Sequence, residues 1–306
     1  MEFKGKLRND KSGVSNLLIA VVIIIIIVVI AAAAYVVLSG DNNNNDTQTI
    51  GPGTVMKFDD VINGESSGVL EEHYIGQNAD EYFIMEKLVN GSAITTQYTV
   101  SSKSDPDGAE ITGTMDLDTI DGAKTLNIWE YTIDGGYSVK SYVDPSSGLT
   151  YKNEFTGTGY SETQTLKEYE LVWQSSYEES DSIGTTYEYN LVIGGITSST
   201  NINIKCVADC QNDQFGVLYD FTSIVPNGNV YFLSDTPQGL PTDATNTGTT
   251  TTLTGTIDGD VTVEIWAGTD SATGFSFYYE PNTHIIYKIT MMSSITEIVF
   301  NLVSGP

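Results

Sequence analysis

The sequence Thr-Ile-Asp-Gly-Ala-Lys-Thr-Leu-Asn-Ile-Trp, residues 119–129, returns as Thr-Ile-Asp-Gly-Asp-Val-Thr-Val-Glu-Ile-Trp, residues 256–266. Seven of the eleven positions are identical at an offset of 137 residues. Further matches follow each copy in the same order: Tyr142-Val-Asp-Pro145 with Tyr278-Tyr-Glu-Pro281, then Tyr151-Lys152 with Tyr287-Lys288. Two of the three tryptophans and two of the eight prolines therefore recur in one arrangement, which indicates an internal duplication rather than chance.

The repeated unit has the pattern of antiparallel strands. Leu126 and Ile128 match Val263 and Ile265, and this period of two is that of a pleated strand. Dipeptides that tolerate the positive φ angles of tight hairpin turns recur along the chain: Asn63-Gly64, Asn90-Gly91, Asp107-Gly108, Asp121-Gly122, Asp134-Gly135, Asn227-Gly228 and Asp258-Gly259. One short helix is expected over residues 78–88.

The predicted fold class is mainly β, with one N-terminal transmembrane helix followed by two tandem homologous antiparallel β domains. The Gly/Thr/Ser-rich stretch from Gly157 to Gln164 is the expected domain boundary. The expected organisation is a cytoplasmic basic segment, a transmembrane helix, an Asn-rich stalk, β domain 1 and β domain 2, over residues 1–16, 17–38, 39–54, 55–163 and 164–306.

Residues 142–152 combine an aromatic residue, Asp-Pro, Gly-Leu and a basic residue in one predicted hairpin. This stretch resembles a hairpin of curved-sheet lipoprotein-carrier domains of the LolA type. The second copy departs from the resemblance, because Thr283-His284-Ile285 stands where Ser-Gly-Leu would be. The resemblance implies a curved antiparallel sheet and, as an alternative function, a binding module for an apolar ligand, with Trp129 and Trp266 as candidate lining residues.

Leu17 to Leu38 is a run of 22 residues without a charge. As a helix it spans the ~30 Å hydrocarbon core of a bilayer. Lys4, Lys6, Arg8 and Lys11 precede the run, and no basic residue follows it until Lys57. The positive-inside rule therefore predicts a single-pass protein of the cell membrane, with the N-terminus in the cytoplasm and residues 41–306 outside.

Three interpretations of this segment stay open. It is an uncleaved signal anchor, a secretory signal cleaved near Ala31 to Ala34, or a pilin-like leader. A short basic leader that ends in Gly13 directly before the apolar run resembles the class III signal peptides of archaeal pilins, whose peptidase would leave Val14 as the first residue. The Glu that bacterial type IV pilins carry at the fifth mature position is absent, since Leu18 stands there. The pilin-like interpretation implies self-association through the helix.

The segment after the apolar run is polar and includes four consecutive asparagines, so it predicts a flexible stalk from Asp41 to Pro52. Asn45 and Asn90 each begin an N-glycosylation sequon. Cys206 and Cys210 lie outside the cell in this topology, where a disulfide is the default. That bond requires a turn at Ala208-Asp209, because on a straight strand the two Cα atoms would be roughly 13 Å apart. Free thiols and a redox or metal role remain the alternatives.

The chain carries 40 acidic and 13 basic residues, for a net charge of −27. This balance argues against a nucleic-acid partner, which needs a basic face. His73 and His284 lie far apart, and no residues form a recognisable nucleophile, metal or cofactor motif. Asp105-Pro-Asp107-Gly108 and the run from Asp116 to Gly122 are acidic but do not match a calcium loop, so solvated turns are expected.

We therefore predict a non-catalytic, acidic, duplicated ectodomain for adhesion, envelope structure or ligand capture. It is anchored in the bilayer through residues 17–38, and the ligand is not identified. The pilin-like filament subunit and the apolar-ligand module are the alternatives.

Overall fold

The structure is a computed structural model that describes residues 49–104, 106, 108–133, 136–174, 176–224, 228–268, 275–292 and 297–305. Its elements are strands and one short 3₁₀ turn, Gln211–Asp213, so the prediction of a mainly β fold is confirmed. The helix expected over residues 78–88 is wrong: Glu81–Asn90 forms strand β4, in which buried and half-buried residues alternate in part. None of the helices in these residues has the length and apolarity that a membrane span needs.

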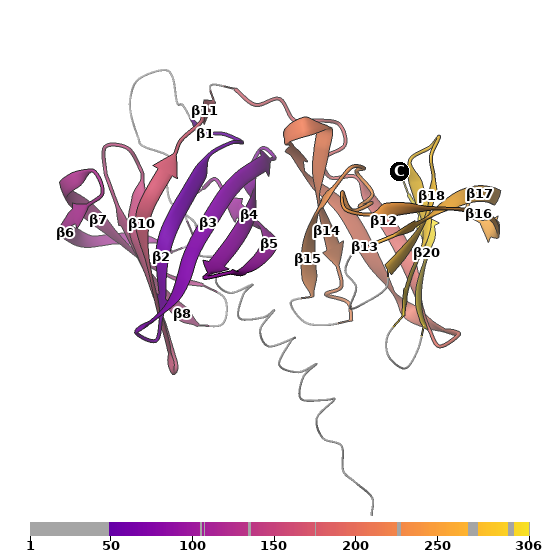
Figure 1. Cartoon of the computed structure of the whole chain (residues 1–306), viewed down its shortest axis with the longest axis horizontal. Helices are drawn as coiled ribbons and strands as arrows, with labels where there is room; N and C mark the ends of the chain where they lie inside the picture. The colour runs from indigo at the N-terminus through magenta and orange to yellow at the C-terminus, as the bar shows by residue number, and fades with distance from the viewer. Residues whose placement is uncertain are drawn as a thin grey trace, which may run out of the picture.

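Nine antiparallel strands make up the first half of the fold, from Val55 to Glu170. Neighbours pair in the order β6-β7-β8-β9-β10-β2-β3-β4-β5 (Figure 1). The strands are β2 (Val55–Ile62), β3 (Glu65–Gln77), β4, β5 (Ala93–Ser102), β6 (Glu110–Thr119), β7 (Gly122–Ile133), β8 (Tyr137–Val143), β9 (Thr150–Gly157) and β10 (Tyr160–Glu170).

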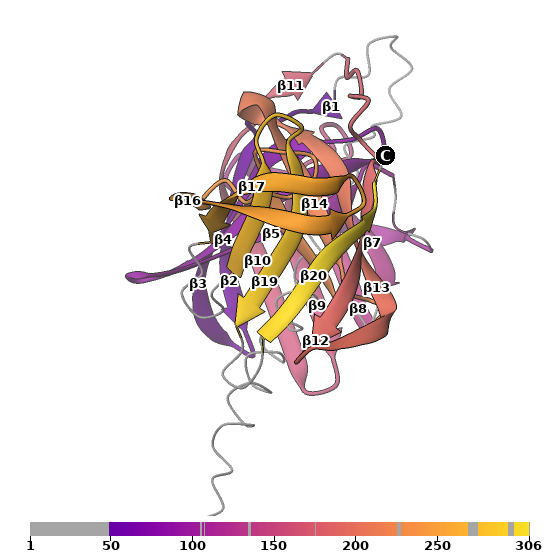
Figure 2. The same ribbon diagram turned by 90° about the vertical axis from the view of Figure 1, so that its right-hand side faces the viewer.

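Nine further strands make up the second half, from Thr186 to Ser304. They pair in the order β16-β17-β18-β19-β20-β12-β13-β14-β15. The strands are β12 (Thr186–Ile193), β13 (Ile196–Cys210), β14 (Gln214–Asp220), β15 (Asn229–Ser234), β16 (Thr245–Thr256), β17 (Gly259–Ala267), β18 (Phe275–Glu280), β19 (Ile285–Met292) and β20 (Glu297–Ser304). In Figure 2 the hairpin β16–β17 crosses in front of β19 and β20.

The strand order of the second half repeats that of the first with each label raised by ten. Irregularities repeat as well: the register shifts after Tyr142 in the β8–β9 pair and after Tyr278 in the β18–β19 pair. A bulge follows Leu166 of β10 in the pair β10–β2, and a bulge follows Leu302 of β20 in the equivalent pair β20–β12. Bulges alter the local twist of a sheet, so the two halves bend at the same places.

The two halves join through the ends of β3 and β13. Gly76 pairs with Cys210 and Gln77 with Asp209, which makes one large antiparallel sheet of both halves. The close approach depends on the missing side chain of Gly76, because a β-carbon there would come within 2.4 Å of the Cys210 sulfur. An apolar cluster lies beside this joint, formed by Phe83, Val207 and Ala208 with half-buried neighbours from both halves.

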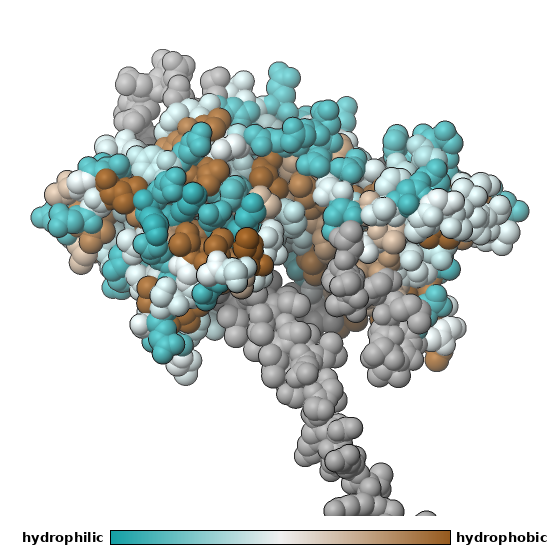
Figure 3. All heavy atoms as spheres, viewed as in Figure 1, coloured by the Kyte–Doolittle hydropathy of each residue, from teal (hydrophilic) through white to brown (hydrophobic). Residues whose placement is uncertain are grey.

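Each half has its own apolar core. In the first half, Phe58, Leu70 and Ile84 pack with other buried side chains. In the second half, the corresponding cluster is larger and includes Tyr189 and Ile202. Figure 3 shows apolar and polar side chains mixed over the first half, whereas the Thr-rich hairpin β16–β17 at the right edge is almost uniformly pale.

Two expected boundaries differ from the structure. The boundary between residues 163 and 164 falls inside β10, which pairs with β2 from Glu162 to Glu170. The Gly-rich stretch before it is only the β9–β10 hairpin turn. The expected stalk also ends earlier. Thr49–Ile50 forms strand β1, which pairs with β11 (Trp173–Gln174), and the Ile50 side chain is buried in the first core. The predicted transmembrane helix and residues 39–48 of the stalk lie outside the described residues.

Candidate functional site

The repeated Thr-Ile-Asp-Gly motif forms the same turn in both halves. The Thr119 hydroxyl donates to the Gly122 carbonyl at 2.7 Å, and Thr256 donates to the Gly259 carbonyl at 2.7 Å. The aspartate of each turn then accepts a hydrogen bond from the tyrosine of the repeated Tyr-Lys pair. Those tyrosines are Tyr151, which donates to Asp121, and Tyr287, which donates to Asp258 at 2.6 Å. The motif is thus turn chemistry that ties β6–β7 to β9 and β16–β17 to β19.

In both acid-Pro turns the carboxylate accepts from the backbone N–H two residues further on, that of Ser146 in the first half and of Asn282 in the second, but the charged partners of the two carboxylates differ. Asp144 caps its own turn and accepts from Lys124 at 2.7 Å. Burial opposes ionisation of Asp144, yet Lys124 and the neighbouring serine donors outweigh it and hold the carboxyl pKa below its usual range. In the second half, Val261 stands at the position of Lys124, so Glu280 has no equivalent lysine.

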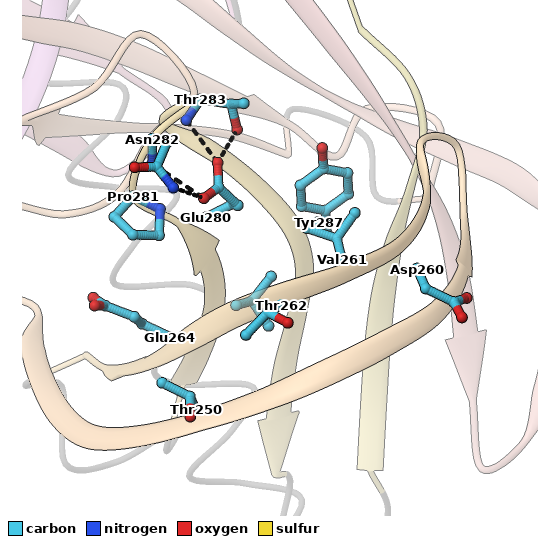
Figure 4. A pocket seen from close by; sticks show the side chains of 11 residues that line it. Thr250, Asp260, Val261, Thr262, Glu264, Glu280, Pro281, Asn282, Thr283 and Tyr287 are labelled. Atoms are coloured by element: carbon cyan, nitrogen blue, oxygen red, sulfur yellow. Dashed lines mark hydrogen bonds between the residues drawn. The ribbon is translucent and has the colours of Figure 1, made fainter.

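A shallow hollow of about 520 Å³ lies beside Glu280 (Figure 4). Its rim carries Asp260 and Glu264, but both Glu280 oxygens are already held by donors of Asn282 and Thr283. Among the described residues, no three His, Cys, Asp or Glu side chains lie together in a way that could hold a metal ion. The hollow is therefore an acidic surface recess whose most buried carboxylate is satisfied by its own turn.

The two halves differ most in the side chains of one cross-strand row. Register partners in adjacent strands place their side chains on the same face of a sheet. In the first half this row carries polar residues after its tryptophan, and it reads Trp129, Ser141, Asn153, Gln164 and Asp60. The equivalent row of the second half is apolar throughout and reads Trp266, Phe277, Ile289, Phe300 and Leu191.

A second row repeats this contrast. Glu72 and Glu86 stand directly opposite each other in β3 and β4. Their equivalents in β13 and β14 are Ile204 and Tyr219, which also stand opposite each other. The four polar members of the first row after Trp129, and both glutamates, are at least 97% buried, so the first half encloses polar groups where the second half encloses hydrocarbon.

The two enclosed glutamates, Glu72 and Glu86, favour their protonated form. Burial raises the pKa of Glu86 to about 7, against the opposing effect of the Gln97 amide, which donates to it at 2.5 Å. Burial and the nearby Glu86 raise the pKa of Glu72 well above its usual value. Within the described part of the chain, neither Glu72 oxygen meets hydrogen-bond geometry, although Tyr74 is close enough to lower the pKa of that carboxyl. These groups can hold protons at neutral pH.

The inner apolar face of the second half is covered by its own chain. The segment from Asp235 to Ala244, between β15 and β16, places Gln238 and Leu240 in the core. The Gln238 amide donates to the Tyr189 hydroxyl at 2.6 Å and accepts from the Ile286 backbone N–H at 2.7 Å. The Tyr219 hydroxyl donates to the Gly239 carbonyl at 2.6 Å. We call residues 235–244 the cover segment.

A pocket of about 240 Å³ remains between the cover segment, the rim of the second half and strand β5 of the first half. Asp243 supplies a carboxylate to its lining. Five of the ten described lining residues are aromatic: Tyr98, Tyr219, Phe232, Phe275 and Phe277. Trp266 is the register partner of Phe277 but is not among the lining residues. It packs edge-to-face on Tyr279 at 5.9 Å and donates to Glu264 at 3.1 Å. Trp129 is half-buried opposite Ser141.

The structure contains no bond between Cys206 and Cys210, and this corrects the expected disulfide. Both residues lie on the continuous strand β13, where four extended residues separate the Cα atoms by roughly 13 Å. Ala208-Asp209 forms no turn, because Ala208 pairs with Gly216 and Asp209 with Phe215.

The other predicted sites divide between described and undescribed residues. Asn90 is exposed at the β4–β5 turn. His73 contacts Glu71 and His284 contacts the Tyr279 hydroxyl, so the two histidines serve different halves. Asp116 accepts from Thr125 in the hairpin β6–β7. The remaining positions lie outside the described residues: Gly13, Val14, Asn45, Asp105 and Asp107.

Sequence reasoning did not find the aromatic pocket, because its walls come from strands far apart in the chain. The signal for its position was faint: Gly268 stands in the second copy where the first has Tyr131. Comparison with known proteins finds no family model and no curated protein that matches the sequence.

Proposed function

We propose that this chain is a single-pass, membrane-anchored cell-surface protein with a non-catalytic, duplicated β ectodomain. The uncharged run from Leu17 to Leu38 and the basic residues before it support an anchor with the N-terminus in the cytoplasm. The net charge of −27 suits an exposed surface on which like charge keeps proteins apart.

We further infer that the two halves are homologous domains produced by duplication. The support is the common strand order together with the bulges that recur at equivalent positions. The β3–β13 pairing is the observation that carries the functional proposal, because it turns two domains into one continuous sheet. A fused pair of domains presents its surfaces at fixed spacing, which suits an adhesive or envelope role.

N-terminal sequencing and intact mass of the protein from native membranes test the anchor. A chain that begins at Met1 and needs detergent for extraction supports the proposal. A chain that begins at Val14 favours the alternative of a pilin-like subunit that assembles through its helix, and electron microscopy of surface fibres is then the next measurement. A start near Tyr35 would contradict both and indicate a secreted protein.

A second candidate function is capture of a ligand with an apolar part, in line with the resemblance of residues 142–152 to lipoprotein-carrier domains. The aromatic pocket beside the cover segment favours it, since ligand sites are concave and mostly apolar with few polar groups. Native mass spectrometry of the purified protein tests this candidate, and a co-purified small molecule that is lost on filling the pocket supports it.

A further inference from the structure

The aromatic pocket is built from both halves of the molecule. Tyr98 of β5 supplies one wall, and its ring stacks on Phe83 at 5.9 Å beside the joint between the halves. Phe232 of β15 and Phe275 of β18 supply further walls, and all three rings are half-buried. Tyr219 and Phe277 are buried beneath them. The three half-buried rings thus line one recess, with Phe232 packed on Tyr219 at 4.9 Å and Phe275 stacked on Phe277 at 6.2 Å.

The pocket is open because of a difference between the repeats. In the first half, the large Tyr131 fills the equivalent place, and its hydroxyl lies 3.4 Å from the Ser141 hydroxyl. In the second half the residue is Gly268, whose N–H donates to the Phe275 carbonyl at 3.0 Å. In the first half a large Tyr131 therefore faces a small Ser141, whereas in the second half a small Gly268 faces a large Phe277. This exchange leaves space in front of Phe275 and Phe277.

The charge of the pocket is negative. Among the described residues that line the pocket, Asp243 is the only charged one, and it is exposed. Burial and the nearby Asp243 raise the pKa of Tyr98, so this hydroxyl stays neutral. The faces of aromatic rings carry partial negative charge and attract cations, most strongly where water is excluded. A chain with a net charge of −27 also concentrates cations at its surface and repels anions.

We propose that this pocket binds a small alkylated ammonium group, held by the rings of Tyr98, Phe232 and Phe275 with the Asp243 carboxylate as counter-charge. The inference deepens the second candidate function, ligand capture, and is independent of the membrane anchor. A volume of about 240 Å³ lies below the ~300–1,000 Å³ of pockets that enclose a whole drug-sized ligand. The ligand is therefore a small free molecule, or the ammonium head of a larger one whose remainder stays outside.

Titration calorimetry on the detergent-solubilised full chain tests this with choline against its neutral isostere, 3,3-dimethyl-1-butanol. We expect choline to bind at least about tenfold more tightly than the isostere. Asp243→Asn should weaken choline binding by about fivefold. Asp213→Asn, at an exposed acid of the second half away from the pocket, is the matched control and should leave affinity unchanged.

A second pair of variants tests the place of binding. Phe275→Leu removes a ring, and Gly268→Ala adds a β-carbon 3.4 Å from Phe275 and Phe277, a distance that the fold tolerates. Both should weaken choline binding while the thermal midpoint stays within a few degrees. Sedimentation with phosphatidylcholine vesicles distinguishes the sources: co-sedimentation that choline inhibits indicates a lipid headgroup, and binding of free choline alone indicates a small solute.

Equal affinity for choline and its neutral isostere would overturn the cationic ligand and leave a purely apolar pocket, so ligand capture would survive. Choline binding that is unchanged in all three pocket variants would overturn the site. If neither compound binds to the folded chain, the inference is overturned, and a native mass spectrum without a co-purified small molecule would separately overturn ligand capture.

Discussion

The ring of Phe83 lies directly over Gly216, where a β-carbon would come within 2.7 Å of the ring. These two residues occupy equivalent positions in the two halves. Phe83 stands opposite Gly76 beside the bulge of β3, and Gly216 stands opposite Ala208 beside the bulge of β13. Because the halves meet at the ends of β3 and β13, equivalent residues face each other, and only one of them can carry a large side chain.

Gly216→Ala should therefore destabilise the joint by about 1–3 kcal/mol, because the new methyl group overlaps the Phe83 ring. Urea denaturation measures the change. Gly113→Ala is the matched control, since nothing lies within 4 Å of its added β-carbon. In the double variant Phe83→Leu with Gly216→Ala, the cost should be smaller than the sum of the single costs. Strict additivity would show that the ring and the glycine do not interact.

The enclosed glutamates predict that stability falls as pH rises. Glu86 has an ordinary pKa of 4.5 in the unfolded chain and about 7 in the fold, so the folded state alone holds its proton between these values. The free energy of unfolding should thus decrease by about 2–3 kcal/mol from pH 4.5 to pH 7 through this group.

Glu86→Gln should raise stability at pH 8 and flatten this part of the pH profile, because the amide remains neutral. Thermal unfolding of both proteins across a pH series measures the dependence of stability on pH. Glu65→Gln, at an exposed position at the start of β3, serves as the control for the loss of one negative charge. A profile for Glu86→Gln parallel to that of the natural chain would refute the prediction.

The ion pair between Lys124 and Asp144 predicts the opposite pH dependence. Lys124→Val installs the residue that the second half carries and should cost about 1–2 kcal/mol at pH 7. The pKa of Asp144 is lowered in the fold, so its contribution is present above the ordinary value of 3.8 and is lost as pH falls. The difference in the free energy of unfolding between Lys124→Val and the natural chain should therefore become smaller below about pH 4.

A surface pair provides the comparison. Lys140→Ala removes the ion pair between Lys140 and Glu130, whose side chains are 46% and 36% exposed, respectively. The free energy of unfolding should change by less than about 1 kcal/mol. If both lysine variants cost the same at pH 7, the partial burial of Asp144 has no energetic consequence.

The two cysteines should behave as unreactive thiols in the folded protein. Burial raises the pKa of Cys206 to about 12 and also raises that of Cys210, so few thiolates exist at neutral pH. Alkylation by iodoacetamide should be slow until denaturant is added, and reductant should change neither the intact mass nor the thermal midpoint. A midpoint lowered by reductant would reveal a disulfide in the natural protein.

The sequence by itself determined the β class, four described hairpin turns and the equivalence of residues 119–129 and 256–266. Turn dipeptides and period-two alternation act over a few residues, and a duplicated motif keeps its hydrogen bonds, as Asp121 and Asp258 show with their tyrosines. The predicted helix failed because pairing with β3 and β5 overrides weak local preference in β4.

Only the tertiary structure decided what the duplication became. The face of the sheet that two residues share depends on the register between strands, and paired strands can lie more than a hundred residues apart in the chain, as for Asp60 and Gln164. The joint at Gly76 and Cys210 and the pocket between Tyr98 and Phe275 both arise from such distant contacts. Local patterns carry no information on these contacts, because each strand alone tolerates either a polar or an apolar residue at those positions.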